Sequence, residues 1–309
     1  MTAKIVFSEV QKSNICRKYL IDKKTILDIA REHCVSETPI KRIFKELNIE
    51  ARKPNETSRK YLLNENYFDI IDSFDKAYFL GLLMADGYNN EKRGAVTLIL
   101  KEDDRLILER FSSYLDTEKP VIRVKNKDGS YTCRMEICSR NISEKLSKLG
   151  CGQAKTFKLK FPDYLNKDLV RHFIRGYFDG DGCISYCFPK RNNRFHNSLN
   201  CVVTFTSTDV FCSFLVDYIK DVLNINSYLS CRHPKHNNNN RTLQISGNKK
   251  VEKIMEWMYV DTDLYLERKC NKFKEFRELL GERRAIVSGQ RSKNGSKVMQ
   301  QINRGRICR

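Results

Sequence analysis

The stretch Phe79–Gly87, FLGLLMADG, returns later in the chain as Ile174–Gly182, IRGYFDGDG. Both stretches have small residues four positions apart, which places those residues on one face of a helix. The small residues are Gly81 and Ala85 in the first copy and Gly176 and Gly180 in the second. A glycine inside a helix costs about 1 kcal/mol relative to alanine, so a compensating contact is needed. We therefore expect the two helices to pack closely against each other along these residues.

Each copy also ends in an aspartate followed by a glycine, and the two aspartates are Asp86 and Asp181. A carboxylate at the C-terminus of a helix is unfavourable, because that end is the negative pole of the helix dipole. Two such carboxylates brought together also repel each other. A divalent cation relieves both penalties, and Mg²⁺ binds through one or two carboxylates plus phosphate. The pair therefore predicts a metal site for phosphodiester hydrolysis, where the ion activates a water.

The duplicated motif resembles that of the LAGLIDADG homing endonucleases, in the form with both copies on one polypeptide. The resemblance covers residues 73–281. It implies that Asp86 and Asp181 hold Mg²⁺ or Mn²⁺ and that both strands of double-stranded DNA are cut, leaving 3′ overhangs. Met84 stands where the family consensus has its first aspartate, whereas the second copy keeps Asp179. The family fold implies two saddle-shaped sheets that follow the major groove, with the active site at the central minor groove.

The resemblance also implies lysines beside the metals. The stretch GQAKTFKLKFP supplies Lys155 and Lys158, and the stretch LYLERKCNKF supplies Arg268 and Lys269. We assign Lys155 and Lys269 as the groups that polarise the catalytic water or the phosphate. The alternative is that each is an ordinary solvated lysine.

The order of predicted elements is the same in residues 73–165 and 166–281: helix, strands, helix, strands, helix. This order predicts an α+β fold in which each half is an antiparallel sheet covered by helices on one face. In the first half, Asp128-Gly129 marks a tight hairpin turn. The resemblance describes the pair as two αββαββα halves related by a pseudo-twofold axis. Because one chain supplies both motifs, we expect a monomer.

Residues 1–52 predict a separate small all-α domain with the helix-turn-helix layout, whose last helix reads the major groove. Three basic residues lie off the apolar face of that helix and are the predicted DNA contacts: Lys41, Arg42 and Lys45. The alternative is a small helical bundle with a solvated basic face. The polar stretch 53–72 predicts a linker, and the basic stretch 282–309 predicts a disordered tail.

The chain of 309 residues has a net charge of +19, from 57 Lys and Arg against 38 Asp and Glu. Such an excess suits a polyanion, either nucleic acid or an acidic membrane surface. We find no apolar run long enough for a transmembrane helix and no signal-peptide core near Met1. We therefore expect neither a membrane-spanning nor a secreted protein. None of the twelve cysteines forms a C-x-x-C pair, so reduced thiols in an intracellular protein are favoured over a zinc site.

Strands that face DNA should carry alternating polar side chains, and arginine, lysine and glutamine are frequent readers of base edges. We predict such contacts in the first half at Arg123, Lys125 and Arg134. In the second half the predicted contacts are Lys190, Arg191, Arg194, Arg232, Arg241 and Gln244. Taken singly, each is more often a solvated strand residue, but as a set they favour nucleic acid.

These observations favour a site-specific, Mg²⁺-dependent DNA endonuclease with a helix-turn-helix module that lengthens its recognition site. By analogy with the family, such an enzyme copies its own gene into cleaved alleles. A second hypothesis is a maturase that binds group I intron RNA on the same scaffold. A third is a DNA-binding regulator derived from a nuclease. Two intact aspartates favour cleavage over both alternatives.

Overall fold

The chain forms two compact units, residues 1–61 and 62–309, which we describe separately. The computed structural model describes residues 5–22, 24–50, 61–153, 155–189, 199–231 and 239–287. The second unit begins earlier than the sequence suggested, because Tyr67 and Phe68 are buried in its core. The expected linker 53–72 is therefore wrong at its C-terminal end, where large aromatic side chains anchor the chain.

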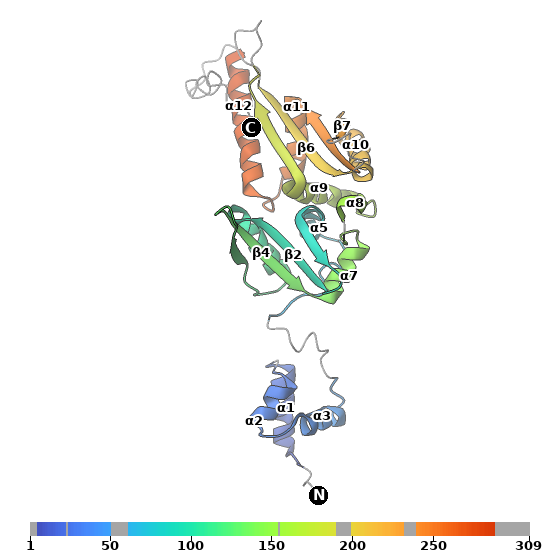
Figure 1. Ribbon diagram of the computed structural model, residues 1–309, viewed down its shortest axis with the longest axis vertical. Coiled ribbons are helices and arrows are strands. Elements are labelled where there is room, and N and C mark those ends of the chain that lie inside the picture. Colours follow the sequence, from blue (N-terminus) through green and yellow to red (C-terminus); the bar gives the residue numbers. More distant parts are fainter. Residues whose placement is uncertain are drawn as a thin grey trace. The chain divides into compact units, whose positions relative to one another are not determined.

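The first unit consists of three helices around one small core (Figure 1). They are α1 (Glu9–Leu20), α2 (Ile26–Glu32) and α3 (Glu37–Glu46). Ser8 and Gln11 form a reciprocal cap at the start of α1, and Thr25 accepts a hydrogen bond from the Asp28 amide at the start of α2. The core contains Ile40, Ile43 and Phe44 from α3. The apolar spacing also predicted Leu47 on this face, but Leu47 follows the end of α3 and is 44% exposed.

The second unit is built around two long helices, α5 (Phe74–Asp86) and α9 (Lys167–Asp181), which lie side by side. These are the two motif helices. A sheet follows each of them, and the two helices lie between the two sheets in Figure 1. Both helices are buried over most of their length, and one hydrophobic core runs through both halves of the unit.

The two sheets have the same construction, with four antiparallel strands in the orders β1-β2-β4-β3 and β5-β6-β8-β7. The first contains β1 (Gly87–Asn90), β2 (Ala95–Lys101), β3 (Ile122–Lys125) and β4 (Tyr131–Cys138). The second contains β5 (Gly182–Cys187), β6 (Asn200–Thr208), β7 (Tyr228–Cys231) and β8 (Asn240–Ser246). This confirms the expected α+β fold with two antiparallel halves. The sequence patterns missed β1, which is short and directly continues the motif helix.

Helices cover one face of each sheet (Figure 1). The first half has η1 (Glu102–Asp104), α6 (Arg105–Tyr114), α7 (Arg140–Lys148) and the short α8 (Lys155–Lys158). The second half has α10 (Asp209–Leu223), α11 (Asn248–Tyr259) and α12 (Glu267–Val287). Alternate strand residues fill the space below them, such as Cys133, Met135 and Ile137 in β4. The opposite face of β4 carries the half-buried polar residues Thr132, Arg134 and Glu136.

The last helix, α12, extends into the stretch that the sequence assigned to a tail beginning at residue 282. It continues to Val287, and residues 288–309 lie outside the described part of the chain. Within the described residues, no helix combines the length and the apolar character required to cross a membrane.

Candidate active site and nucleic-acid interface

The motif helices α5 and α9 touch through their small residues. A Cβ atom on Gly81 would lie 2.1 Å from the carbonyl oxygen of Phe173, and one on Gly176 would lie 2.0 Å from that of Tyr78. A Cβ on Gly180 would lie 2.3 Å from the Cβ of Ala85. Any larger side chain at the glycines would push the backbones apart. The expected close packing along this stripe is thus confirmed.

This crossing brings Asp86 and Asp181 to one place, where each follows the last turn of its helix. Burial and the nearby Asp181 carboxylate raise the pKa of Asp86 to about 6. Burial also raises the pKa of Asp181, against the opposing effect of Lys155 and Lys269. The site therefore holds two close carboxylates that resist ionisation unless positive charge is added.

Lys155 and Lys269 lie beside the carboxylates, and each reaches the C-terminal carbonyls of one motif helix. The Nζ atom of Lys155 donates to the carbonyl oxygens of Leu83 and Ala85, both at 2.7 Å. Lys269 donates to the carbonyl oxygens of three residues in the second copy: Phe178, Gly180 at 3.3 Å and Gly182 at 2.7 Å. These bonds satisfy carbonyls that the end of a helix leaves unpaired.

Burial lowers the pKa of both lysines, and that of Lys269 falls to about 8. Neither lysine is the ordinary solvated side chain that the alternative required. Lys269 is only 6% exposed. The buried Lys269 and the half-buried Lys155 thus lie beside two solvent-accessible carboxylates at the crossing of α5 and α9.

A cavity of about 290 Å³ opens beside Asp181 and gives solvent or a ligand access to this centre. Its lining includes Lys155 and residues at the end of β6. The polar residues that line it are Lys155, Tyr177, Asp181, Thr206, Ser207, Thr208 and Asn240. The Tyr177 hydroxyl donates to the carbonyl oxygen of Thr206 at 2.9 Å. Tyr177 was not predicted, although its position one helical turn before Asp181 places it on the same face.

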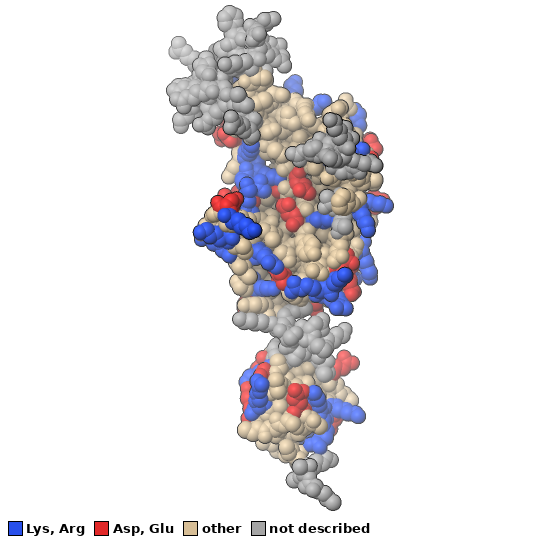
Figure 2. Space-filling view, viewed as in Figure 1, with Lys and Arg blue, Asp and Glu red and all other residues tan. Residues whose placement is uncertain are grey.

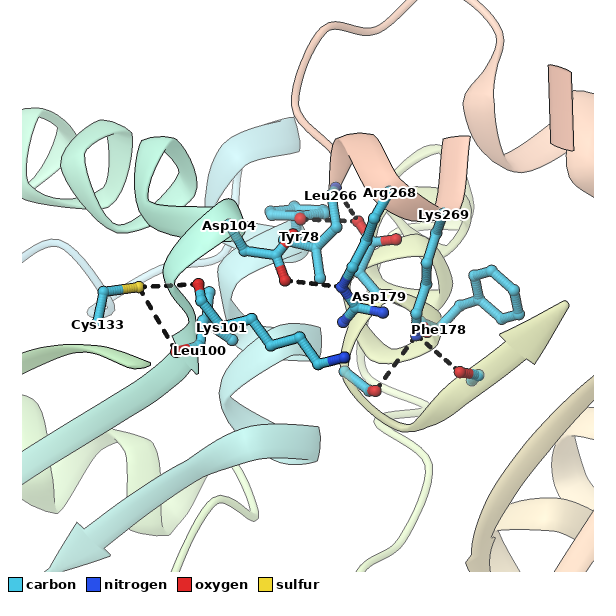
Figure 3. A network of polar contacts seen from close by, with 12 residues as sticks. Tyr78, Leu100, Lys101, Asp104, Cys133, Phe178, Asp179, Leu266, Arg268 and Lys269 are labelled. Atoms are coloured by element: carbon cyan, nitrogen blue, oxygen red, sulfur yellow. Dashed lines mark hydrogen bonds and ion pairs between the residues drawn. The ribbon is translucent and has the colours of Figure 1, made fainter. Parts of the chain in front are cut away.

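Arg268 approaches the centre from α12 and pairs with a residue of the first half (Figure 3). Its Nε atom lies 2.7 Å from a carboxylate oxygen of Asp104, whose side chain is 2% exposed. The Arg268 charge is one of those that lower the pKa of Asp86. Figure 3 shows Lys101, at the end of β2, extending toward the same region. The importance of Asp104 could not be foreseen, because its partner lies in the other half.

The side chains at the centre suit a hard divalent cation. Asp86 and Asp181 supply oxygen ligands, and Mg²⁺ needs few protein ligands because it retains several waters. No group of three or more His, Cys, Asp or Glu side chains with metal-binding geometry occurs in the described ranges. The carboxylate pair would therefore share the ion with water and phosphate, as expected for Mg²⁺ and not for structural zinc.

The three basic residues predicted as DNA contacts in the first sheet do not share one face of it. Arg134 lies on the outer face, whereas Arg123 pairs in register with Cys133 and Lys125 with Tyr131. Cross-strand partners share a face, and Cys133 points into the core. Arg123 and Lys125 therefore lie on the opposite face from Arg134. Both are exposed all the same, because β3 is the edge strand.

In the second sheet, Gln244 and Arg241 also lie on different faces. Arg241 shares the face of the buried Leu243 and Ile245, and its Nε atom lies 2.9 Å from the carboxylate of Asp209 at the start of α10. Gln244 lies on the outer face and donates to Ser246 at 2.8 Å. The prediction that treated Arg241 as part of the outer face is wrong, since strand residues of odd and even number alternate.

Several residues of the outer faces were missed because they are not basic. Tyr88 and Tyr228 are 59% and 67% exposed, and each is a large side chain that can contact a ligand. Tyr88 pairs with Thr97, and Tyr228 pairs with Gln244. The register of the hairpins is the signal that would have found them. The predicted contacts Lys190, Arg191, Arg194 and Arg232 lie outside the described residues.

Basic side chains are spread over the surface of both units. Figure 2 shows Lys and Arg covering more of the second unit's visible face than Asp and Glu do, including the β3–β4 hairpin. In the first unit, Lys41, Arg42 and Lys45 are exposed on α3. Lys41 pairs with Glu37 at 2.6 Å, and Arg42 donates to the carbonyl oxygen of Ile5 at 2.7 Å. On the face shown in Figure 2, the basic side chains do not gather in one dominant patch.

Residues 168–257 match the family described as the LAGLIDADG-like domain. The match begins in α9 and ends in α11, so it spans the second sheet. The first half lies outside this match and has the same strand order as the second.

Relatives of known sequence and structure are distant. An uncharacterized protein of Methanocaldococcus jannaschii, MJ0314, is 25% identical over 190 residues, which span 57% of this chain and 65% of the relative's length. The I-LtrWI LAGLIDADG homing endonuclease bound to target DNA gives a TM-score of 0.46 at 13% identity, covering 78% of this chain and 98% of that chain. The LAGLIDADG meganuclease I-AabMI bound to uncleaved DNA gives 0.48 at 12%, covering 73% and 97%.

Proposed function

We propose that this chain is a divalent-metal-dependent endonuclease that cuts both strands of double-stranded DNA at a specific site. One observation carries the proposal: two carboxylates that solvent can reach, Asp86 and Asp181, meet at the crossing of α5 and α9 beside Lys155 and Lys269. A structural pair of helices has no need for such an arrangement, because close carboxylates at two helix ends destabilise the fold.

In this proposal Asp86 and Asp181 hold Mg²⁺ or Mn²⁺. When bound, the ion lowers the pKa of a water and stabilises negative charge on the phosphate oxygens. Lys155 has three N–H donors, of which two bond to the carbonyls of Leu83 and Ala85. The third can orient a water or a phosphate oxygen in the cavity beside Asp181. Lys269 supplies a second positive charge on the other side of the pair.

DNA recognition in this proposal uses the outer faces of both sheets, with Arg134 and Gln244 among the readers and Tyr88 and Tyr228 as further contacts. The first unit, with Lys41, Arg42 and Lys45 on α3, binds beside the cleavage site in the manner of a helix-turn-helix. A monomer suffices, because one chain supplies both carboxylates. Cleavage of this kind would serve the homing of an intron or a free-standing gene.

The test is a cleavage selection with the full chain on plasmids that carry randomised DNA duplexes, in Mg²⁺ and in EDTA. We expect linear product with one shared sequence at its ends, only when metal is present. The control is the Asp86→Asn/Asp181→Asn double variant, which should retain DNA binding and yield no product. Metal-independent cutting, or equal cutting by the double variant, would contradict the proposal. Splicing of an intron RNA without any DNA cutting would instead support the maturase alternative.

A further inference from the structure

The carboxylate of Asp179 lies two residues before Asp181 and is completely buried. Three donors surround it, as Figure 3 shows in part. The Tyr78 hydroxyl donates to its Oδ2 at 2.8 Å, and the Tyr259 hydroxyl donates to its Oδ1 at 2.5 Å. The backbone N–H of Leu266 also donates to Oδ2, at 2.8 Å. Asp179 thus joins α5, the end of α11 and the approach to α12.

The bond to Leu266 matters because Leu266 determines where α12 begins. The Leu266 carbonyl accepts hydrogen bonds from the amides of Lys269 at 3.0 Å and Cys270 at 3.2 Å. Asp179 therefore fixes one side of the Leu266 peptide, and Lys269 is bonded to the other. From there the Lys269 side chain reaches back to the carbonyls of Phe178 and Gly182, on either side of Asp179 and Asp181. Hydrogen bonds therefore tie the start of α12 to the end of α9 twice, once through Leu266 and once through the Lys269 side chain.

The first half positions its lysine by different contacts. Met84 occupies the position that corresponds to Asp179, and it is buried. The segment before Lys155 is instead held by Asn89, whose Nδ2 atom donates to the carbonyl oxygens of Ser143 and Cys151, both at 2.9 Å. The Cys151 thiol donates in turn to Leu83 at 3.4 Å. Asp179 has no polar counterpart at the equivalent place.

We propose that Asp179 is a positioning residue for Lys269, and that it thereby governs one of the two strand cuts more than the other. This inference rests on the proposed nuclease function. Lys269 comes from α12 of the second half and Lys155 from α8 of the first, so displacement of Lys269 leaves Lys155 and its contacts unchanged. A local change at Asp179 should therefore unbalance the two cuts.

Asp179→Asn tests this with little change in shape. Asparagine keeps one oxygen acceptor but replaces the other with an NH₂ donor, which faces a tyrosine hydroxyl or the Leu266 N–H. If the NH₂ group faces Leu266, that hydrogen bond is lost; if it faces Tyr259, the hydroxyl must accept instead of donate. In both cases the negative charge that holds the start of α12 is removed, and the remaining hydrogen bonds are weaker. Loss of a residue that orients a functional side chain typically costs about 10–100-fold in activity.

The measurement uses a duplex that contains the selected target with a different fluorophore on each strand, so that the two nicking rates are obtained separately. We expect Asp179→Asn to slow one strand by about 10–100-fold and the other by less than about threefold. Lys269→Met, which keeps the apolar stem of the lysine, should slow the same strand. The Asp179→Asn/Lys269→Met double variant should be no slower on that strand than Lys269→Met alone, because the two residues act as a unit.

Asn89→Ala is the matched control, since it removes buried hydrogen bonds from the other half. It should not slow the strand affected by Lys269→Met. If Asn89→Ala produced the same strand bias, the bias would reflect general destabilisation and the inference would be overturned. Equal slowing of both strands by Asp179→Asn, or additive effects in the double variant, would overturn it as well.

Tyr259→Phe provides a milder variant in case Asp179→Asn does not fold. It removes a single hydrogen bond to Asp179 and should shift the strand ratio in the same direction by a smaller factor. An unchanged ratio in this folded variant would count against the inference. Failure of the proposed function is distinguishable, because in that case the wild-type chain cuts neither strand.

Discussion

The first and second halves share a backbone plan and differ in the polar contacts inside it. Both have the same strand order, and in both a lysine from a later segment bonds to the C-terminal carbonyls of the motif helix. Yet Lys155 reaches two carbonyls and Lys269 reaches three. The backbone therefore follows the pseudo-twofold symmetry more closely than the side-chain hydrogen bonds do.

The difference is also visible one turn before each aspartate. Tyr177 precedes Asp181 and its hydroxyl bonds to Thr206 beside the cavity, whereas Leu82 precedes Asp86 and is fully buried. Arg268 contributes charge near Asp86. A duplicated frame thus contains two inequivalent centres, one more apolar and close to an arginine, the other lined by hydroxyl groups. The contrast teaches that the two copies must share the backbone packing at the helix crossing, whereas the polarity of the side chains around each aspartate can differ.

The largest effect is expected from changing the two aspartates, which both halves have at the end of the motif helix. Asp86→Asn and Asp181→Asn, made singly, should each reduce double-strand cleavage to the level of protein-free DNA, because the carboxylates form one site. Conversion of supercoiled target plasmid to linear DNA measures this, with binding checked by gel shift. If one variant linearised plasmid at the wild-type rate, the aspartates would serve separate sites and the halves would be independent.

The shared helix crossing provides the second test. Gly176→Ala places a methyl group about 2.0 Å from the carbonyl oxygen of Tyr78, and backbone cannot move aside without separating α5 from α9. We expect a loss of about 3 kcal/mol or more in the free energy of unfolding, measured by urea denaturation. Gly281→Ala in α12 is the matched control, since nothing lies within 4 Å of its added methyl group. It should gain up to about 1 kcal/mol from helix propensity.

A third test asks whether the two halves alone account for DNA affinity. A chain that starts at Leu62 removes the first unit and leaves the second one complete. It should bind more weakly, give a shorter DNase footprint on one side and still cut at saturating protein. Each phosphate contact contributes a slope of about −0.9 to log K against log salt, so the truncated chain should show a shallower slope. An unchanged footprint and slope would mean that the first unit does not contact DNA.

The smallest expected effect concerns the pH dependence of stability. The folded-state pKa of Asp86 is about 6, above the ordinary value of 3.8. The charged carboxylate therefore destabilises the fold above pH 6, and this penalty shrinks as the pH falls from 6 to 3.8, below which Asp86 is mostly protonated in both states. At pH 7.5 without metal, Asp86→Asn should raise the free energy of unfolding and the melting temperature, and solvent screening of the exposed carboxylate limits the gain to about 1 kcal/mol or less.

The gain from Asp86→Asn should shrink at pH 4.5, and Mg²⁺ should raise the melting temperature of the wild type but not of the variant. Calorimetric scans at the two pH values, with and without Mg²⁺, measure both effects. A variant that gained equally at both pH values would show that the penalty does not come from the charge on Asp86.

The sequence was sufficient for the motif helices, the α+β halves, the crossing glycines and the lysines beside the carboxylates. The helices, the halves and the glycines follow from short-range periodicity and from a duplicated motif whose two copies can be aligned, whereas the lysines were implied by the family resemblance. The sheet surfaces were harder, because the face of Arg123 or Arg241 depends on cross-strand register, which a one-residue shift inverts. The pairs Asp104–Arg268 and Tyr78–Asp179 were out of reach, because each joins residues from different halves.

The continuous core of the second unit has a consequence for how the molecule folds. Apolar side chains from both halves meet along α5 and α9, and polar bonds such as Tyr78–Asp179 cross between the halves. Neither half can hide its motif helix from water without the other, so neither should be a folding domain. Residues 62–287 should lose structure in one cooperative transition. The duplication thus joined two repeats into a single thermodynamic unit, in which a half can be replaced only by one with a complementary helix surface.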